Sequence, residues 1–344
     1  MSQTPRQSAE RSVERSVPTS ADVARLAGVS RATVSYVLNN TSAVRISEPT
    51  RRRVREAAEE LGYVPHAAAR SLRAGHTRMV LLPTGQVPVG PLHSRFLNEI
   101  QWALRRLDYT VVQYGSMGLD GDTAARAWAE LRPVAIVSLG EIALTPHGVE
   151  VLKRSGAKAV ITLGPRHVEG AHSLVMDQRE VGARAAEHLL ERGRRRIAVI
   201  MPEEPGLDLF SEPRLAGVRQ AAEPAGATVR AVPLAYEEGA AEALAARWRE
   251  LGADAVYAYN DEYAMLLMRA LQDAGIRVPD ETAVIGADDL LLGRLLRPRL
   301  STVRMDFVTG QYLAELVDRV VREPGGAPER HDPMGATVVR REST

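Results

Sequence analysis

The sequence predicts a small all-α headpiece built around a helix-turn-helix, followed by a two-lobed α/β domain with parallel sheets. The chain has 344 residues, more than one ordinary domain needs. Residues 1–76 carry a net charge of +5, and the rest of the chain carries a net charge of −4. Beyond residue 76, short β-rich runs alternate with amphipathic helical stretches, a pattern typical of parallel strands joined by helices.

The composition excludes several classes of protein. The chain contains no cysteine, which excludes a disulfide scaffold, thiolate metal sites and a cysteine nucleophile. No run of about 18 apolar residues occurs, so we expect no membrane-spanning helix. Residues 1–18 are rich in Ser, Gln, Arg and Glu and lack the apolar stretch of a secretory signal. We therefore expect them to form a disordered cytoplasmic tail.

Residues 19–39 predict the helix-turn-helix. Gly28 separates two short helical patterns, and glycine tolerates the left-handed conformation of a tight turn. Ser30 can cap the second helix by accepting a hydrogen bond from a backbone N–H. The residues expected to pack inward are Val23, Ala24, Leu26, Ala27, Val34, Val37 and Leu38. The second helix of such a motif lies in the major groove of DNA.

The first residues of this second helix have side chains that suit DNA. Arg31 can form two hydrogen bonds with a guanine, and the methyl group of Ala32 can meet that of a thymine. Ser30 and Thr33 suit phosphate oxygens, helped by the helix N-terminus. The alternative is a small helical bundle that binds nothing, but such a bundle gives little reason for these small residues.

A third helix is expected to complete the headpiece, which spans residues 19–64. Ser47 can cap this helix, and an acidic residue and a proline follow in its first turn. Its apolar stripe consists of Val54, Ala57, Ala58 and Leu61. Its solvent face carries four arginines, which are either phosphate contacts or ordinary solvated charges: Arg51, Arg52, Arg53 and Arg55.

Residues 65–76 predict a hinge helix and a linker. Pro65 marks a break, good helix formers follow, and Gly75 ends the run. A helix of about two turns is too short to be stable alone in water. We therefore expect DNA and a partner copy of the chain to order it.

The N-terminal motifs resemble the DNA-binding headpiece of the lactose-repressor (LacI/GalR) family. The match consists of Asp22-Val-Ala, Ala27-Gly-Val-Ser, Thr33-Val-Ser, Leu38-Asn39, Gly62-Tyr-Val-Pro and Ala69-Arg-Ser-Leu72. This resemblance implies that Arg31, Ala32 and Tyr36 read bases. It implies that Leu72 is inserted between base steps of the minor groove, which bends the site. It also places further residues at the DNA: Ser35, Asn39, Tyr63, His66 and Ala69.

Two features depart from the family pattern. His66 stands where the family usually has asparagine, and residues 41–46 form a slightly longer stretch than in the lactose repressor itself. Both departures leave the family assignment intact, but they prevent the transfer of an operator sequence.

Residues 77–344 are expected to form the two lobes. The expected strands are Met79–Leu82, Thr110–Gln113, Val134–Ser138, Ala159–Thr162, Ile197–Met201, Thr228–Val232, Ala255–Tyr259 and Ala283–Gly286. The expected helices are Phe96–Arg106, Arg179–Arg192, Arg214–Ala225 and Tyr263–Ala274. We expect the chain to cross first between lobes near residues 174–178, and again near Arg304 and Arg322. In such folds, ligands bind at the carboxyl ends of the strands.

This second part resembles the effector domain of the same family, which is like the periplasmic sugar-binding proteins. The match includes Met176-Asp-Gln, Arg214-Leu-Ala-Gly-Val, Tyr259-Asn-Asp, Val284-Ile-Gly-Ala-Asp-Asp289 and Pro298-Arg-Leu-Ser-Thr-Val303. The resemblance implies that Arg214, Asp261 and Asp288 line the effector cleft. An arginine fork and carboxylates suit a sugar or a related polar metabolite.

Each of these three residues also has a purely structural interpretation. Arg214 can pair with Glu212 or with an acid across the cleft. Asp261 and Asp288 stand where a strand ends and a helix can begin, so each can be a helix cap. Ligand contact and capping are compatible.

Aromatic residues that could stack on a sugar ring are scarce. The whole chain contains 3 Phe and 3 Trp, and we expect Phe210 and Tyr257 to supply the platform. Residues 83–93 contain no aromatic side chain, although the family commonly has one near the ligand there. Ala287 also replaces a residue that is commonly aromatic.

An enzyme is the first alternative function. The adjacent carboxylates Glu203-Glu204 and Asp288-Asp289 invite a hydrolase interpretation, but neighbours in sequence rarely face one site. The sequence has no phosphate-binding loop, nucleophile elbow or dinucleotide-binding glycine motif. His167 and His172 do not have the spacing of a metal-binding pair. We expect no catalytic residue, no metal and no cofactor.

A solute-binding protein is the second alternative, since it would share the two-lobed body. Such a protein needs export, and it leaves the basic headpiece without a purpose. The sequence thus predicts a transcriptional regulator, by the family's usual behaviour a repressor. We expect a homodimer that binds double-stranded palindromic operator DNA and a small-molecule effector, in the cytoplasm at the nucleoid.

Overall fold

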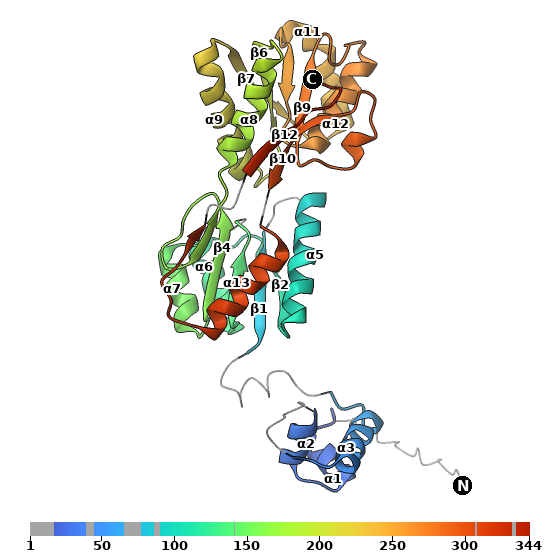
Figure 1. Cartoon of the computed structure of the whole chain (residues 1–344), viewed down its shortest axis with the longest axis vertical. Coiled ribbons are helices and arrows are strands. Elements are labelled where there is room, and N and C mark those ends of the chain that lie inside the picture. Colours follow the sequence, from blue (N-terminus) through green and yellow to red (C-terminus); the bar gives the residue numbers. More distant parts are fainter. Residues whose placement is uncertain are drawn as a thin grey trace, which may run out of the picture. The chain divides into compact units, whose positions relative to one another are not determined.

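The structure is a computed structural model that describes residues 17–38, 45–64, 77–85, 90–140, 142–306, 308–331 and 335–344. The chain divides into two compact units, Met1–Thr77 and Arg78–Thr344, whose elements are labelled in Figure 1. Residues 1–16 of the tail expected at residues 1–18, and the hinge helix expected at residues 65–76, lie outside the described residues.

The described residues of the first unit form three helices: α1 (Ser20–Ala27), α2 (Arg31–Leu38) and α3 (Glu48–Glu60). Thr19 and Asp22 form a capping box at the start of α1, and Gly28 ends that helix with φ of 66°. The helices pack around Val23, Ala24, Ala27, Val34, Val37, Val54, Ala57 and Ala58. Leu26, expected to pack inward, is instead 46% exposed, because the smaller Ala27 fills the inner face of this short helix.

The first lobe of the second unit is a six-stranded sheet in the order β11-β5-β4-β3-β1-β2, with every pair parallel. Its strands are β1 (Met79–Thr84), β2 (Thr110–Gly115), β3 (Ala135–Ser138), β4 (Ala159–Gly164), β5 (His172–Val175) and β11 (Arg330–His331). One face is covered by α5 (Pro91–Arg106) and α13 (Gly310–Arg322). The other is covered by α6 (Gly121–Glu130) and α7 (Pro146–Arg154).

The second lobe repeats this plan with a sheet in the order β12-β10-β9-β8-β6-β7. Its strands are β6 (Arg196–Pro202), β7 (Thr228–Leu234), β8 (Ala255–Tyr257), β9 (Ala283–Ala287), β10 (Ser301–Asp306) and β12 (Gly335–Val339). Only the β10–β12 pair is antiparallel among the described pairs. One face packs on α8 (Gln178–Glu191) and α9 (Asp208–Ala222), with η1 (Glu223–Ala225) after α9. The other packs on α10 (Glu238–Ala246), α11 (Trp248–Leu251) and α12 (Asp261–Asp273), while η2 (Leu292–Arg294) follows β9.

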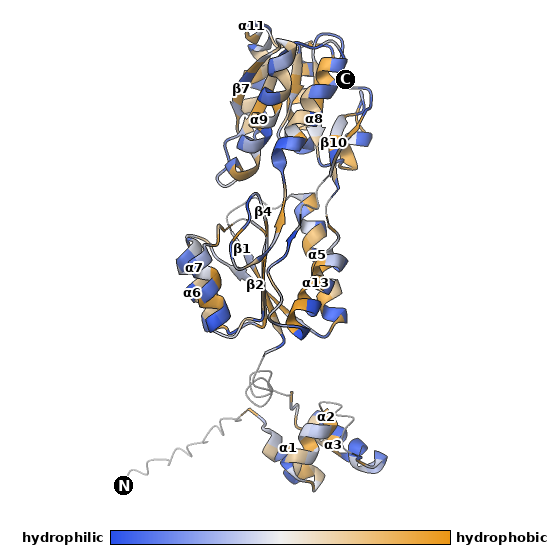
Figure 2. Cartoon of the chain, turned by 60° about the vertical axis from the view of Figure 1, so that its left-hand side comes forward, coloured by the Kyte–Doolittle hydropathy of each residue, from blue (hydrophilic) through white to orange (hydrophobic). Residues whose placement is uncertain are grey.

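Each lobe buries apolar strands between helices whose outward faces are more polar (Figure 2). All eight expected strands are present, with ends that differ by up to two residues. Helix α9 begins at Asp208 rather than at Arg214, because Pro213 lies within the helix instead of starting it.

Three connections join the lobes. They run from β5 to α8, from β10 to α13 and from β11 to β12. The expectation of a crossing at Arg322 is wrong, because α13 ends there and the chain first adds β11 to the sheet of the first lobe. An edge strand of two residues leaves no periodic signal in the sequence.

Candidate functional site

A cavity of about 860 Å³ lies between the two lobes of the second unit. The first lobe contributes apolar side chains, among them Leu92, Phe96, Leu139 and Leu163, together with the polar side chains of His93, Arg95, Glu99 and Thr309. The second lobe contributes mainly polar and aromatic ones, namely Glu204, Arg214, Tyr236, Tyr259, Asn260, Tyr263 and Asp288. A ligand held here would therefore meet apolar and polar side chains from the first lobe and a denser set of polar and aromatic groups from the second.

Arg214 is the central cation of the cavity, and it is only 5% exposed. Its Nε donates to Oε1 of Gln178 at 2.8 Å, and its Nη1 donates to the carbonyl oxygen of Tyr259 at 2.5 Å. The guanidinium also lies 4.9 Å from the centre of the Tyr259 ring. The pairing with Glu212 that the sequence allows is not found, because neutral acceptors hold the fork instead.

Close packing of α8 against α9 fixes the backbone of Arg214. A Cβ atom added at Gly182 would lie 1.9 Å from the carbonyl oxygen of Arg214. One added at Gly217 would lie 1.9 Å from the carbonyl oxygen of Arg179. Only glycine allows the two helix backbones to approach this closely. The position of the arginine is thus set by two glycines that lie outside the lining of the cavity.

Asp288 lines the cavity beside Arg214. Burial raises the pKa of its carboxyl group to about 6, although Arg214 acts in the opposite direction. It does not cap a helix, since no helix begins at this position and its φ is +103°. Its carboxylate is therefore available to accept hydrogen bonds from a ligand in the cavity.

Asp261 does not line the cavity, which corrects the expectation from sequence. Its side chain is fully buried behind the wall, where its Oδ2 accepts a hydrogen bond from the backbone N–H of Leu290 at 2.7 Å. Burial raises the pKa of this carboxyl group to about 7. The capping interpretation is also wrong, because Asn260 caps α12 by accepting from the N–H of Tyr263.

Three tyrosines of the second lobe form an aromatic corner in the cavity wall, which the sequence did not predict. The ring of Tyr263 lies 5.1 Å from that of Tyr236 and 5.8 Å from that of Tyr259. The Tyr263 hydroxyl donates to Glu204, whose other oxygen accepts from the N–H of Tyr236 at 2.6 Å. Although partial burial opposes them, these hydrogen bonds hold the pKa of Glu204 below its usual value.

Of the two aromatic residues expected at the ligand, Phe210 lines the cavity and Tyr257 does not. Tyr257 is fully buried in β8, where burial raises the pKa of its hydroxyl to about 12. This corrects the expectation of a stacking platform there, because the Tyr257 ring fills the core between the sheet and α8 and α9.

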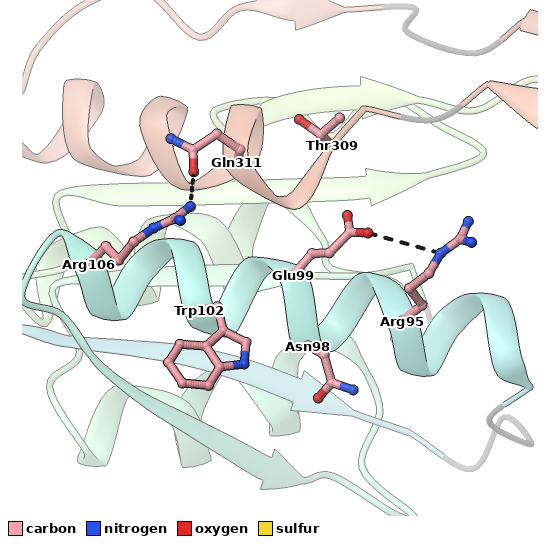
Figure 3. Close-up of a pocket in the computed structure, with 7 residues that line it drawn as sticks. All are labelled: Arg95, Asn98, Glu99, Trp102, Arg106, Thr309 and Gln311. Carbon is pink, nitrogen blue, oxygen red and sulfur yellow. Dashed lines mark hydrogen bonds and ion pairs between the residues drawn. The ribbon is translucent and has the colours of Figure 1, made fainter.

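A second, shallower pocket of about 600 Å³ lies along α5 and the start of α13 (Figure 3). Arg106 donates to Oε1 of Gln311 at 2.6 Å, and Arg95 lies 4.0 Å from Glu99. Trp102 is 70% exposed beside them. These side chains mainly interact with one another, so this pocket offers fewer directed groups than the central cavity.

The helix-turn-helix presents a defined outer face. Val34 and Val37 point into the core, which leaves Arg31, Ala32 and Tyr36 exposed on α2. Ser30, Thr33 and Ser35 lie on the same helix or at its start. Ser30 Oγ caps the helix by accepting from the N–H of Thr33 at 3.1 Å. Tyr63 packs partly against the core of the headpiece.

The remaining expected DNA contacts, Asn39, His66, Ala69 and Leu72, lie outside the described residues. Of the α3 arginines, Arg51 is half-buried and donates to the carbonyl oxygen of Ile46 at 3.3 Å. Arg52, Arg53 and Arg55 are exposed, and Arg52 lies 3.8 Å from Glu56.

Of the helices that the structure describes, none has the length and hydropathy to cross a membrane. The described His, Asp and Glu side chains form no group of three that could hold a metal ion.

Comparisons with known proteins agree with this division of the chain. Residues 19–66 match the family of bacterial regulatory proteins called the lacI family, and residues 186–344 match a periplasmic binding protein-like domain. The HTH-type transcriptional regulator GalR of Escherichia coli (strain K12) is 32% identical over 333 residues, which cover 94% of each protein. This chain belongs to the lacI family.

Solved structures support the lacI-family fold over almost the whole chain. A lac repressor dimer bound to operator and the anti-inducer ONPF superposes with a TM-score of 0.76 at 22% identity, covering 95% of this chain and 99% of that one. A complex of the transcriptional regulator CelR with cellobiose gives a TM-score of 0.61 at 26% identity, covering 95% and 100%. As a lacI-family member, the chain is a DNA-binding transcriptional regulator with an effector domain of the periplasmic-binding-protein type.

The sequence predicted the polar residues Arg214 and Asp288 of the cavity wall, but it did not predict the aromatic corner. Tyr259 and Tyr263 flank the three residues Asn260-Asp-Glu262, so the start of α12 carried an aromatic pattern from which the corner could have been predicted. Tyr236 carried none, because it lies in an irregular segment after β7.

Proposed function

We propose that the chain is a repressor that binds a palindromic operator as a homodimer and is controlled by a carbohydrate-like effector held in the central cavity. The observation that carries this proposal is the composition of the cavity wall. Arg214 has N–H groups beyond those bonded to Gln178 and Tyr259 that can donate to hydroxyl groups, and Asp288 can accept from them. Tyr236 offers an aromatic face to the C–H groups of a sugar ring.

The size of the cavity favours a ligand of one or two sugar rings. Its volume of about 860 Å³ lies within the usual range for small-molecule sites. The similarity to CelR, which was solved with cellobiose, adds support for a saccharide. Because both lobes contribute side chains to the lining, a sugar that contacts both would bring the two lobes together.

For DNA binding, we propose direct base contacts by Arg31, Ala32 and Tyr36, with phosphate contacts by Ser30, Thr33 and Ser35. The exposure of the first three residues on one helix supports this assignment. By the family resemblance, residues 65–76 form a hinge whose Leu72 enters the minor groove, with Asn39, Tyr63, His66 and Ala69 nearby. The headpiece then comprises residues 19–64, and residues 77–344 bind the effector.

The proposed homodimer is supported by an apolar surface on the second lobe. Leu291, Leu292 and Leu295 are 68%, 60% and 66% exposed within one short segment. Clustered exposed leucines are typical of surfaces that become buried on association.

We further propose that the protein acts in the cytoplasm at the nucleoid and has no catalytic activity.

Selection of random duplex DNA on the full-length protein, at a stated salt concentration, tests the DNA-binding proposal. We expect an enriched palindrome for the wild type. For Arg31→Ala we expect relaxed preference at one base pair per half-site, with the others retained. Arg25→Ala is the matched control, since Arg25 is an exposed arginine on α1. An unchanged base preference in the Arg31 variant would remove the assigned role.

Thermal-shift screening then tests the effector proposal with cellobiose, D-galactose and D-ribose as probes. A stabilising sugar should also change the affinity for the selected operator, because a ligand stabilises the state that it binds. If none of the three sugars stabilises the protein, the carbohydrate proposal fails, and the DNA selection stands independently.

A further inference from the structure

The turn that carries Asp288 into the cavity has an unusual backbone. Asp288 and Asp289 follow β9 directly, and their φ values are +103° and +51°. Residues other than glycine rarely adopt positive φ, and two in succession persist only where the surroundings hold them. The orientation of the Asp288 carboxylate therefore depends on what holds this turn.

Each backbone N–H of the turn is anchored to a different neighbour. The N–H of Asp288 donates to the carbonyl oxygen of Val303 at 3.0 Å, and that of Asp289 donates to Oγ1 of Thr302 at 3.2 Å. The N–H of Leu290 donates to the buried Asp261 carboxylate. Asp261 thus acts behind the cavity wall, where it supports the turn.

The side chain of Asp289 is held between two arginines. Its Oδ2 accepts from Arg294 at 2.9 Å, and its Oδ1 accepts from Nη2 of Arg341. Arg294 is half exposed, whereas the side chains of Arg341 and Asp289 are 11% and 10% exposed. Nη1 of Arg341 also donates to the carbonyl oxygen of Leu300 at 2.6 Å. Arg341 therefore joins the turn to the chain just before β10.

Arg341 is itself held by the C-terminal segment of the chain, residues 341–344. Ser343 is fully buried, and its hydroxyl donates to the carbonyl oxygen of Val284 at 2.6 Å. Oγ1 of Thr344 lies 2.8 Å from Nε2 of the buried His188 and 2.8 Å from Oγ of Ser301. The segment is thus fastened to β9, β10 and α8 by buried polar contacts, which makes it a rigid base for the Arg341 side chain.

We propose that Arg341 is a positioning residue for effector recognition: through Asp289 it holds the turn that directs Asp288 into the cavity. The proposal rests on the proposed effector site. It gives the C-terminal segment a role in ligand recognition, although Arg341 does not line the cavity. If Arg341 only stabilised the lobe, its removal would increase hydrogen exchange throughout the lobe rather than specifically in the turn.

Hydrogen exchange of the full-length protein, read by mass spectrometry on peptides that cover residues 286–292, tests the proposal without any ligand. For Arg341→Ala we expect about tenfold faster exchange at Asp289 and Leu290, with peptides from α12 unchanged. Arg341→Lys should recover part of the protection. Arg299→Ala is the matched control, because Arg299 pairs with Glu342 of the same segment through an exposed contact. It should leave the turn within about twofold of the wild type.

A double-mutant cycle with Asp289→Asn identifies the route. If Arg341 acts through Asp289, the effect of Arg341→Ala on the turn should largely vanish in the Asp289→Asn background. Three results would each overturn the proposal. They are additive effects of the two substitutions on the exchange rate of the turn, an equally large rate increase in the Arg299 variant, and faster exchange throughout the lobe. If Arg341→Ala does not fold, the exchange rates of the turn in Arg341→Lys and Asp289→Asn are compared with that in Arg299→Ala. Faster exchange in the first two variants than in the third supports the proposal, and equal rates overturn it.

Calorimetric titration with cellobiose separates this inference from the proposed function. If the wild type binds cellobiose, we expect Arg341→Ala to raise its Kd about tenfold while operator affinity without sugar stays within about threefold. An unchanged Kd would overturn the role in recognition. If the wild type does not bind cellobiose, the assignment of that disaccharide fails, and the exchange experiment still decides whether Arg341 positions the turn.

Discussion

At the scale of single residues, the second lobe buries two carboxyl groups whose pKa values are raised by burial, Asp261 to about 7 and Asp288 to about 6. A carboxyl group whose pKa is raised on folding binds its proton more tightly in the folded state than in the unfolded state. Its contribution to stability is therefore complete below the ordinary pKa of 3.8 and is lost as the pH rises through the folded value.

The first prediction concerns Asp261→Asn. The amide keeps an oxygen for the N–H of Leu290 but cannot ionise. The wild type loses stability between pH 4 and pH 7 as the Asp261 carboxyl group ionises, and the variant does not. We expect its free energy of unfolding to gain on the wild type by up to about 1.4 kcal/mol per pH unit in that window. Urea unfolding at pH 5, 6, 7 and 8 measures the difference. Parallel pH profiles for the two proteins would contradict the prediction.

The second prediction concerns Tyr236, which is 49% exposed in the aromatic corner. Tyr236→Ala should raise the Kd for a bound sugar about tenfold, the effect of losing one aromatic contact of about 1–1.5 kcal/mol. Tyr236→Phe keeps the ring and should keep the affinity. Tyr312→Ala removes a ring of similar exposure on α13, outside the cavity lining, and serves as the control. Calorimetric titration with the saccharide found by screening reads all three variants.

At the scale of elements, the predicted strands were those with apolar or β-branched runs, whether buried on both faces or, like β2 and β7, partly exposed. β3 and β4 are buried at every position and stand out as apolar runs. By contrast, β12 is a half-exposed strand of five residues, and β10 contains Ser, Thr, Arg and Asp. Their places in the sheet depend on partners far away in sequence, such as the antiparallel pairing of Val303 with Val338. Local pattern cannot supply that information.

The site divides in the same way. Arg214 and Asp288 lie in motifs shared with the family, so the resemblance predicted their place in the cleft, and both line the cavity. The burial of Asp261 could not be predicted, because it depends on Gly286, where an added Cβ would lie 2.3 Å from Oδ1 of Asp261. Such close contacts between elements decide whether a carboxylate faces the cavity or is buried behind the cavity wall.

The third prediction concerns the contact between α8 and α9. Gly182→Ala places a methyl group against the carbonyl oxygen of Arg214, so the helices must separate. We expect a loss of about 1–3 kcal/mol in the free energy of unfolding, together with weaker effector binding because Arg214 moves. Gly239→Ala in α10 is the control, since an added Cβ there meets nothing within 4 Å. It should be neutral or stabilising by up to about 1 kcal/mol.

At the scale of the whole molecule, function requires the effector cavity in one unit to influence DNA binding by the other. The hinge proposed at residues 65–76 precedes the second unit, which begins at Arg78, and an isolated helix of that length is marginal in water. A segment close to its folding midpoint responds to a change of only a few kcal/mol in its surroundings. Closure of the lobes on a ligand can supply a change of that size if it alters how two hinge segments meet in a dimer.

The fourth prediction follows from this coupling and concerns Leu72. If the hinge folds only on a specific site and inserts this side chain between base steps, Leu72→Ala removes a contact that nonspecific DNA never gains. We therefore expect operator affinity to fall by at least about tenfold while affinity for unrelated duplex changes by less than about twofold. Titrations of both DNAs at two salt concentrations measure the ratio, and the salt slope should stay the same because no phosphate contact is lost. An equal loss on both DNAs would mean that Leu72 serves the stability of the headpiece rather than the recognition of the operator.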